Sequence, residues 1–207
     1  MAKELKLLLR DTSEDLVVAW ESAFNGYDNV EISCGNIFDF PADAIISPAN
    51  SFGFMDGGID LVYSHYFGWS LQKALQKKIR DVYCGELPVG LATIVKTDDE
   101  EIKYLISAPT MRMPALISET VNAYLAFRAS LIEVVKFNKN NTEQILSILC
   151  PGLGTGVGKL SSENCAFQMK YAYDSIILKK FSFPKSLEEA YFGHKYMKQN
   201  QNRRQEK

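Results

Sequence analysis

One short loop carries two side chains, one near its start and one at its end, that have the chemistry to bind and activate a small ligand. The loop, Pro48 to Asp60, reads PANSFGFMDGGID. Asn50 offers an amide that donates and accepts hydrogen bonds, and Asp60 offers a carboxylate that can orient or deprotonate a water molecule. Gly57 and Gly58 lead into a predicted helix, whose first N–H groups can hold an anionic oxygen. The loop contains no His or Cys, so it favours ligand binding with carboxylate assistance.

A second loop, Pro151 to Lys159, reads PGLGTGVGK and carries glycine at every second position from 152 to 158. Glycine lets backbone N–H groups turn toward an anion and lets the anion approach without a Cβ in the way. Each loop follows a short apolar run, 43–47 or 145–150, that is typical of a buried strand. Ligands of open α/β sheets collect at the carboxyl ends of central strands, so we expect both loops to face one crevice that holds a phosphate or diphosphate.

Two familiar phosphate motifs do not fit the second loop. The Walker pattern would need glycine at Leu153 and Ser or Thr at Leu160. The dinucleotide pattern G-x-G-x-x-G would need glycine at Val157. These failures argue against a P-loop-like phosphotransferase. A flexible turn remains the alternative for this glycine string, as does a helix-start carboxylate for Asp60 and a turn residue for Asn50.

The elements that must position these loops alternate between strand and helix. We predict strands over 4–9, 29–33, 43–47, 90–96, 103–107 and 145–150, and helices over 16–24, 59–80, 120–137 and 161–179. The runs 90–96 and 103–107 are predicted to form a hairpin around the charged turn 97–100. This order predicts an α/β fold, a three-layer α/β/α sandwich with a central mixed sheet.

The composition indicates one soluble, intracellular domain. The 207 residues, 46% of them hydrophobic, suffice for one core, which we expect over residues 1–194. Residues 195–207 hold five Lys or Arg against one Glu and are predicted to be a polar basic tail. The net charge of -2 argues against a nucleic-acid partner. The chain has no apolar run long enough for a membrane span and no signal peptide, so we expect a cytoplasmic protein.

The four cysteines are widely spaced and form no C-x-x-C pair. They are Cys34, Cys84, Cys150 and Cys165. Most of them stand in apolar contexts, so we predict buried free thiols in place of disulfides or zinc ligands.

Taken together, these segments resemble the macro domain family of ADP-ribose-binding α/β/α modules. The resemblance covers roughly Val30 to Leu178. Residues 34–37 resemble the family's G-D-I segment, and 42–50 resemble its V-D-A-I-V-N-A-A-N. Residues 57–60 resemble the end of G-G-G-G-V-D, with the same ten-residue step from asparagine to aspartate, and 151–158 resemble the P-x-x-S-T-G-V-x-G loop.

The resemblance implies a set of site residues. Asn50 would hold the distal ribose, and Asp60 would orient or deprotonate the attacking water. The other ligand-binding residues implied are Asn36, Ile37, Ala49, Gly57, Gly58, Ile59, Gly154, Thr155, Gly156, Val157 and Gly158. The family commonly has aspartate at Asn36 and glycine at Met55 and Asp56. Many family members have an aromatic residue beside the distal ribose, at a place that falls between the consecutive residues Val157 and Gly158 of this chain. Because that aromatic residue is absent here, stacking on the ribose would come from Phe52 or Phe54.

The resemblance further implies a function with ADP-ribose or a derivative as ligand, and with no cofactor or metal ion. One alternative is a hydrolase acting on ADP-ribosyl esters of proteins, on O-acetyl-ADP-ribose or on ADP-ribose 1''-phosphate. An ADP-ribosylated protein is then a further candidate partner. The other alternative is a non-catalytic reader or sensor of ADP-ribose or related nucleotides, which needs the same binding residues without a competent Asp60.

Overall fold

The computed structural model describes residues 5–48 and 50–198. The strands are β1 (Lys6–Asp11), β2 (Val30–Cys34), β3 (Ala44–Ser47), β4 (Thr93–Lys96), β5 (Tyr104–Ser107) and β6 (Ser147–Cys150). The helices are α1 (Glu14–Ala23), α2 (Gly58–Phe67), α3 (Ser70–Tyr83), α4 (Asn122–Asn140), α5 (Ser162–Ile176) and α6 (Leu187–Lys198), with a short 3-10 helix η1 (Ile37–Asp39).

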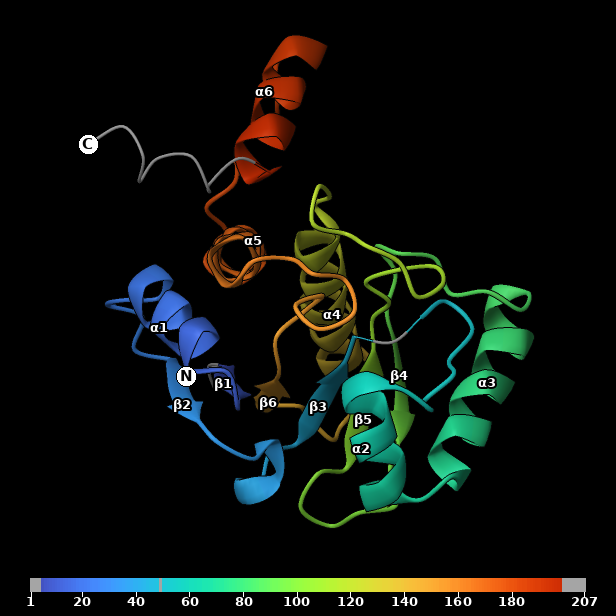
Figure 1. The fold of residues 1–207 in the computed structure, drawn as a ribbon. Helices are drawn as coiled ribbons and strands as arrows, with labels where there is room; N and C mark the ends of the chain where they lie inside the picture. Colours follow the sequence, from blue (N-terminus) through green and yellow to red (C-terminus); the bar gives the residue numbers. More distant parts are fainter. Residues whose placement is uncertain (1–4, 49, 199–207) are drawn as a thin grey trace.

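The described strands form one sheet in the order β2-β1-β6-β3-β5-β4. Neighbouring strands run parallel except β4, which is antiparallel to β5 as the predicted hairpin requires. Helices α1, α4 and α5 cover one face of the sheet, and α2 and α3 cover the other (Figure 1). The predicted three-layer α/β/α sandwich with a mixed sheet is therefore confirmed.

Alternating residues of the central strands build two cores, one on each face of the sheet. In β3, Ala44 and Ile46 pack in the core under α1, α4 and α5, whereas Ile45 packs in the core under α2 and α3. Leu149 of β6 joins the same second core. Because side chains alternate across a strand, both faces must be apolar in a strand covered on both sides. This explains why these strands are continuous apolar runs.

One carboxylate aligns the two strands that precede the predicted loops. Asp43, just before β3, accepts hydrogen bonds at Oδ2 from the backbone N–H groups of Leu146 and Ser147, both at 2.8 Å. Its own N–H donates to Ser147 Oγ at 2.9 Å. These bonds tie the start of β3 to the start of β6, so the parallel strands end together and their following loops leave the same edge of the sheet.

Two predicted elements differ from the structure. The predicted helix 59–80 is two helices, because Gly68 ends α2 with φ +86°, a backbone conformation that side chains disfavour, and Trp69 then begins the cap of α3. Helix α6 was not predicted, and it runs across the predicted boundary between the domain, which was to end at residue 194, and the tail, which was to begin at residue 195. Residues 199–207 of that tail lie outside the described residues.

All four cysteines are free, as predicted, but only Cys150 and Cys165 are buried. Burial raises the pKa of Cys165 to about 12, so this thiol stays protonated and inert at neutral pH. The prediction of buried thiols is wrong for Cys34 and Cys84, which are exposed. None of the described helices is both long and apolar enough to cross a membrane.

Candidate functional site

A crevice of about 410 Å³ lies at the carboxyl edge of the sheet, where the two predicted loops meet. Its volume falls within the roughly 300–1,000 Å³ common for small-ligand sites. Most of the predicted site residues line it: Asn50, Gly57, Gly58, Ile59, Asp60, Gly154, Thr155, Gly156, Val157 and Gly158. Hereafter "the crevice" means this space. The structure thus brings together residues that are about a hundred positions apart in the chain.

Two sets of free backbone N–H groups line the crevice. At one wall α2 begins, and its first backbone hydrogen bond runs from Leu61 N–H to the carbonyl oxygen of Gly57, which leaves the N–H groups of residues 58–60 without helical acceptors. At the other wall, the N–H groups of residues 154–158 donate to no acceptor among the described residues. Free N–H groups and the positive end of a helix dipole both favour a bound anion.

The glycines of the second loop serve two different purposes. A Cβ at Gly152 or Gly154 would overlap the side chains of Leu16 or Ile117, and one at Gly158 would lie 2.6 Å from the carbonyl oxygen of Gly154. These glycines are needed for the loop to fold tightly. A Cβ at Gly156 meets no atom within 4 Å, and the same holds for Gly57 and Gly58 in the first loop. Glycine at positions 57 and 156 keeps space open in the crevice, whereas Gly58 also has φ +56°, a backbone conformation that favours glycine.

The Asn50 side chain shapes the first loop from inside. Its Oδ1 accepts hydrogen bonds from the N–H groups of Phe52 (3.1 Å) and Phe54 (3.3 Å), and its Nδ2 donates to the carbonyl oxygen of Phe54 (2.9 Å). An asparagine that bonds the backbone two and four residues ahead is a turn former. One hydrogen of the Nδ2 amide remains for a ligand at the crevice wall.

Asp60 is the most chemically distinctive group of the crevice. It lies in the first turn of α2, is only 7% exposed, and accepts a hydrogen bond from the buried hydroxyl of Ser47 at the end of β3. Burial raises the pKa of Asp60 to about 7, although the Ser47 hydroxyl opposes this shift. A carboxylate of this pKa is protonated in part of the molecules at neutral pH and can exchange a proton there.

The crevice is acidic in its side chains. Among the described residues that line it, the charged types are three aspartates, Asp11, Asp56 and Asp60, and no Lys, Arg or His. Asp11 is engaged in structure, because it accepts hydrogen bonds from the N–H groups of Gly152 and Ser13, both at 3.0 Å. An anion in this crevice would therefore be held by backbone dipoles and not by side-chain cations.

The structure does not bring every predicted site residue to the crevice. Asn36 is exposed and uses its side-chain oxygen to accept from the Phe38 N–H at 3.2 Å, at the start of η1. Ile37 is 4% exposed in the core under α2 and α3. Neither lines the crevice, so their contact with a ligand stays a prediction. Ala49 lies outside the described residues.

The structure also resolves the two aromatic candidates and the unusual Met55. Phe54 lines the crevice and is 49% exposed, whereas Phe52 lies under the guanidinium of Arg112, 5.0 Å from its ring centre. Met55 is fully buried and anchors the loop in the core, with its N–H donating to Gln72 Oε1 at 2.7 Å. Of the two residues in place of family glycines, only Asp56 reaches the crevice.

Three features of the crevice were not predicted from the sequence: the loop after β5, the side chain of Asp11 and the hydrogen bond from Ser47 to Asp60. Thr110, Met111 and Pro114 line the crevice from the segment that follows β5. In the structure β5 runs parallel to β3, so the loop after β5 leaves the same edge of the sheet. The sequence predicted 103–107 only as one arm of a hairpin, which did not show this pairing. Asp11 was missed because the first strand was predicted to end at Leu9, two residues early. Ser47 was taken only as a strand residue.

Comparison with known families and structures agrees with this geometry. The family model described as Macro domain matches residues 46–169, which include both loops. The chain belongs to the macro domain family. A relative, an uncharacterized protein of Aquifex aeolicus, is 32% identical over 141 residues, which cover 68% of this chain and 78% of that protein. A protein of Aeropyrum pernix is 30% identical over 130 residues, 63% of this chain and 62% of that protein.

Solved macrodomains share the fold. The macrodomain of Mycobacterium tuberculosis DarG superposes with a TM-score of 0.58 at 21% identity, covering 70% of this chain and 90% of that one. An Oceanobacillus iheyensis macrodomain mutant, solved with ADP-ribose, gives 0.53 at 24% identity, covering 65% and 72%. Thermosipho africanus DarTG in complex with ADP-ribose gives 0.54 at 19% identity, covering 72% of this chain and 38% of that one.

Proposed function

We propose that the crevice binds ADP-ribose, or a derivative that keeps its diphosphate and distal ribose. The observation that carries this proposal is the pair of free N–H sets, at residues 58–60 and 154–158, on the walls of one crevice. Two separate sets suit a diphosphate better than a single phosphate. The two structural neighbours solved with ADP-ribose support the choice of ligand.

The remaining crevice residues suit a ribose beside the diphosphate. The free amide hydrogen of Asn50 is available to a ribose hydroxyl, and the half-exposed ring of Phe54 offers an apolar surface to the sugar. Because the donors are neutral backbone N–H groups, no cationic side chain among the crevice residues that the structure describes neutralises the negative charge of the diphosphate. Asp56 is a carboxylate in the same crevice, so the affinity is limited by repulsion from the diphosphate.

Hydrolysis of an ADP-ribosyl bond is a second candidate function, and Asp60 is the observation that favours it. General bases work best when their pKa lies near the working pH, and burial brings the pKa of Asp60 to about 7. In this proposal Asp60 takes a proton from a water molecule with help from the substrate's own phosphate. The substrates are ADP-ribosyl protein esters, O-acetyl-ADP-ribose or ADP-ribose 1''-phosphate. Without this step the protein is a reader of the bound nucleotide.

The test is a product assay on the three substrate classes with wild type, Asp60→Ala and Asn50→Ala. A hydrolase should lose turnover by on the order of a hundredfold or more in Asp60→Ala and keep its ADP-ribose affinity within severalfold. Asn50→Ala should weaken both, since it also loosens the loop that carries Phe54.

Asp56→Ala is the matched control, because it removes a carboxylate from the same crevice without touching the buried one. It should retain turnover. If wild type binds ADP-ribose but converts none of the three substrate classes, the hydrolase proposal is wrong and the reader function stands.

A further inference from the structure

A second, larger hollow lies at the opposite end of α5, away from the crevice. This groove of about 1110 Å³ is bounded by α4, the end of α5, the segment 179–184 and α6, and it shares no lining residue with the crevice. Figure 1 shows α6 projecting from the body beyond α5. The segment and α6 lie beyond the residues that match the family model. Hereafter "the groove" means this hollow.

The wall formed by α6 is held in place at its C-terminal end. Gln168 and Asn164 of α5 donate side-chain hydrogen bonds to the carbonyl oxygens of Met197 and Lys198, each at 3.4 Å. The ring of Tyr196 lies against Phe167, with centroids 5.2 Å apart. Side-chain donors at a helix C-terminus satisfy carbonyl groups that the helix leaves free. The groove is therefore a built feature, although α6 buries none of its own residues.

The groove is basic on a chain that is acidic overall. Its lining carries Arg128, Lys179, Lys180 and Lys195, together with His194, against the single acid Glu189. The three lysines form no ion pair with any residue that the structure describes. Unpaired cations gathered on one surface attract a polyanion even when the net charge of the chain is -2.

Aromatic side chains line the groove together with these cations. The aromatic residues that line the groove are Tyr124, Tyr171, Phe181, Phe183, Phe192 and Tyr196. Phe181 and Phe183 are 68% and 85% exposed, so their faces are open to a partner. Exposed apolar surface of this kind marks an interaction site. Flat rings beside unpaired cations suit a ligand that has both phosphates and flat bases.

We propose that the groove binds single-stranded nucleic acid, with the lysines along the phosphates and the phenylalanines stacked on unpaired bases. A duplex fits less well, since its bases are already stacked on one another and only its phosphates remain for contact. A protein partner fits less well too: the aromatic residues would suit one, but lysine, which supplies three of the groove's cations, is depleted in protein–protein interfaces. The prediction that nucleic acid is no partner considered the net charge and not its distribution.

The test is fluorescence anisotropy with a labelled single strand of mixed sequence, about 12 nucleotides long, measured on the full chain. We expect binding that is tighter than for the matching duplex. Lys179→Glu with Lys180→Glu should weaken it by on the order of tenfold or more. Phe183→Ala should weaken single-strand binding roughly fivefold or more through lost stacking, and duplex binding far less.

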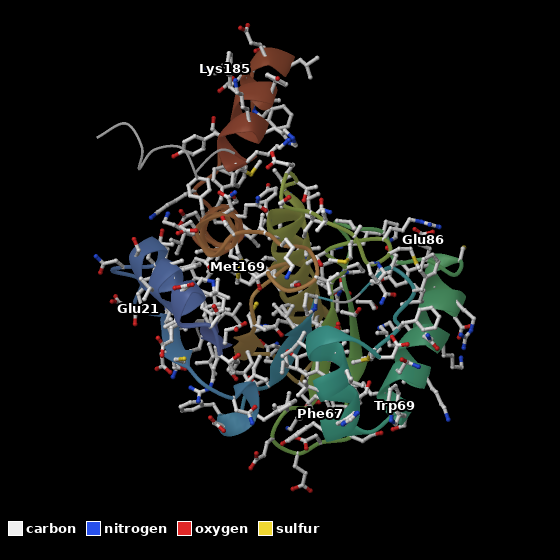
Figure 2. All side chains as sticks on the ribbon, in the orientation of Figure 1. Glu21, Phe67, Trp69, Glu86, Met169 and Lys185 are labelled. Carbon is white, nitrogen blue, oxygen red and sulfur yellow. The ribbon has the colours of Figure 1, made fainter. Side chains whose placement is uncertain are left out.

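Two controls separate the groove from its surroundings. Lys73→Glu with Arg80→Glu makes the same charge change on the exposed face of α3. Trp69→Ala removes a half-exposed ring that lies far from Lys185, the residue that follows the segment 179–184 (Figure 2). Both should leave binding unchanged. Residues 203–207 add three more Lys or Arg against one Glu after α6.

Three results would overturn the proposal. The first is a loss of oligonucleotide affinity in the α3 control as large as in the Lys179 and Lys180 variant. The second is unchanged oligonucleotide affinity in the Lys179 and Lys180 variant, which would mean that the basic tail attracts the strand and the groove does not. The third is self-association of the chain through Phe183 without any oligonucleotide binding, which would make the groove an interface between two copies.

Discussion

The crevice and the groove both suit phosphate groups, but by opposite physical means. The crevice offers fixed backbone N–H groups, open glycines and no cationic side chain among the residues described for it. The groove offers exposed lysines and aromatic rings and has a single acid in its lining. Fixed dipoles in a shaped space select one ligand, whereas mobile surface charges attract polyanions in general. The two regions should therefore respond to different perturbations.

The largest expected effect comes from placing one new carboxylate in each region. Gly156→Glu should weaken ADP-ribose binding by on the order of a hundredfold or more, a loss of ~3 kcal/mol in binding free energy. The new side chain would occupy the path of the diphosphate and repel its charge. The fold should survive, since a Cβ at Gly156 meets no atom within 4 Å. Titration calorimetry measures the affinity and circular dichroism checks the fold.

Gly193→Glu is the reciprocal variant, as Gly193 lines the groove in α6 and its Cβ position is also open. It should weaken oligonucleotide binding and leave ADP-ribose affinity unchanged. If each variant damaged both ligands, the two regions would not be independent sites.

Salt should separate the regions next. Neutralising about three phosphates predicts a roughly twentyfold loss of single-strand affinity between about 50 and 200 mM salt. ADP-ribose affinity should change less than about threefold over the same range, because backbone dipoles exchange no counterions. Anisotropy and calorimetry at matched salt concentrations check this. A steep salt dependence for ADP-ribose would mean that side-chain cations, and not N–H groups, hold it.

The buried carboxyl of Asp60 makes the free energy of unfolding of the chain depend on pH. The pKa of this carboxyl is about 7 in the folded chain and near 4 when exposed, so the folded state binds the proton more tightly. Stability is then lost as pH rises from about 4 to about 7 and is constant above. Asp60→Asn removes this penalty and keeps an acceptor for the Ser47 hydroxyl. Its gain in unfolding free energy should be about 2.5 kcal/mol larger at pH 8 than at pH 5.

Urea denaturation at the two pH values measures this gain. Asp56→Asn, the same chemical change at an exposed position, should show no such widening. A gain for Asp60→Asn that is equal at both pH values would mean that Asp60 is an ordinary carboxylate.

The smallest expected effect concerns the charge of Asp56. Because Asp56 lines the crevice without a cationic partner there, Asp56→Asn should tighten ADP-ribose binding roughly twofold to fivefold, less than ~1 kcal/mol at an exposed site. The gain should shrink as salt is added. Calorimetry at low and moderate salt checks it, and weaker binding by the variant would show that Asp56 contacts the ligand favourably.

The sequence predicted the parts of the molecule where local pattern and topology agree. Apolar runs ending in Pro48 and Pro151 predicted two strands whose loops meet, and parallel pairing of β3 with β6 brings those loops to one crevice. The helical spacing between Ile59 and Arg80 continues through Gly68, so periodicity alone could not predict the break that a positive φ imposes.

Other features depend on contacts that no local pattern records. Helix α6 buries none of its residues, so its apolar positions follow no core-facing spacing, and the helix was missed. The pKa of Asp60 depends on burial by distant elements and on Ser47, thirteen positions away. The turn role of Asn50 was weighed as an alternative to ribose binding, and the structure shows the turn bonds directly.

The central claim is that both N–H sets of the crevice act together on one diphosphate, and calorimetric titration of wild type with ADP-ribose, AMP and ribose 5-phosphate tests it most directly. AMP and ribose 5-phosphate each carry one phosphate and can reach only one set at a time. The account predicts measurable ADP-ribose binding and affinities at least about tenfold weaker for the other two, since a lost set of hydrogen bonds to a charged group is worth ~1.5–3 kcal/mol. Equal affinity for ADP-ribose and AMP, or no binding of ADP-ribose at all, would contradict it.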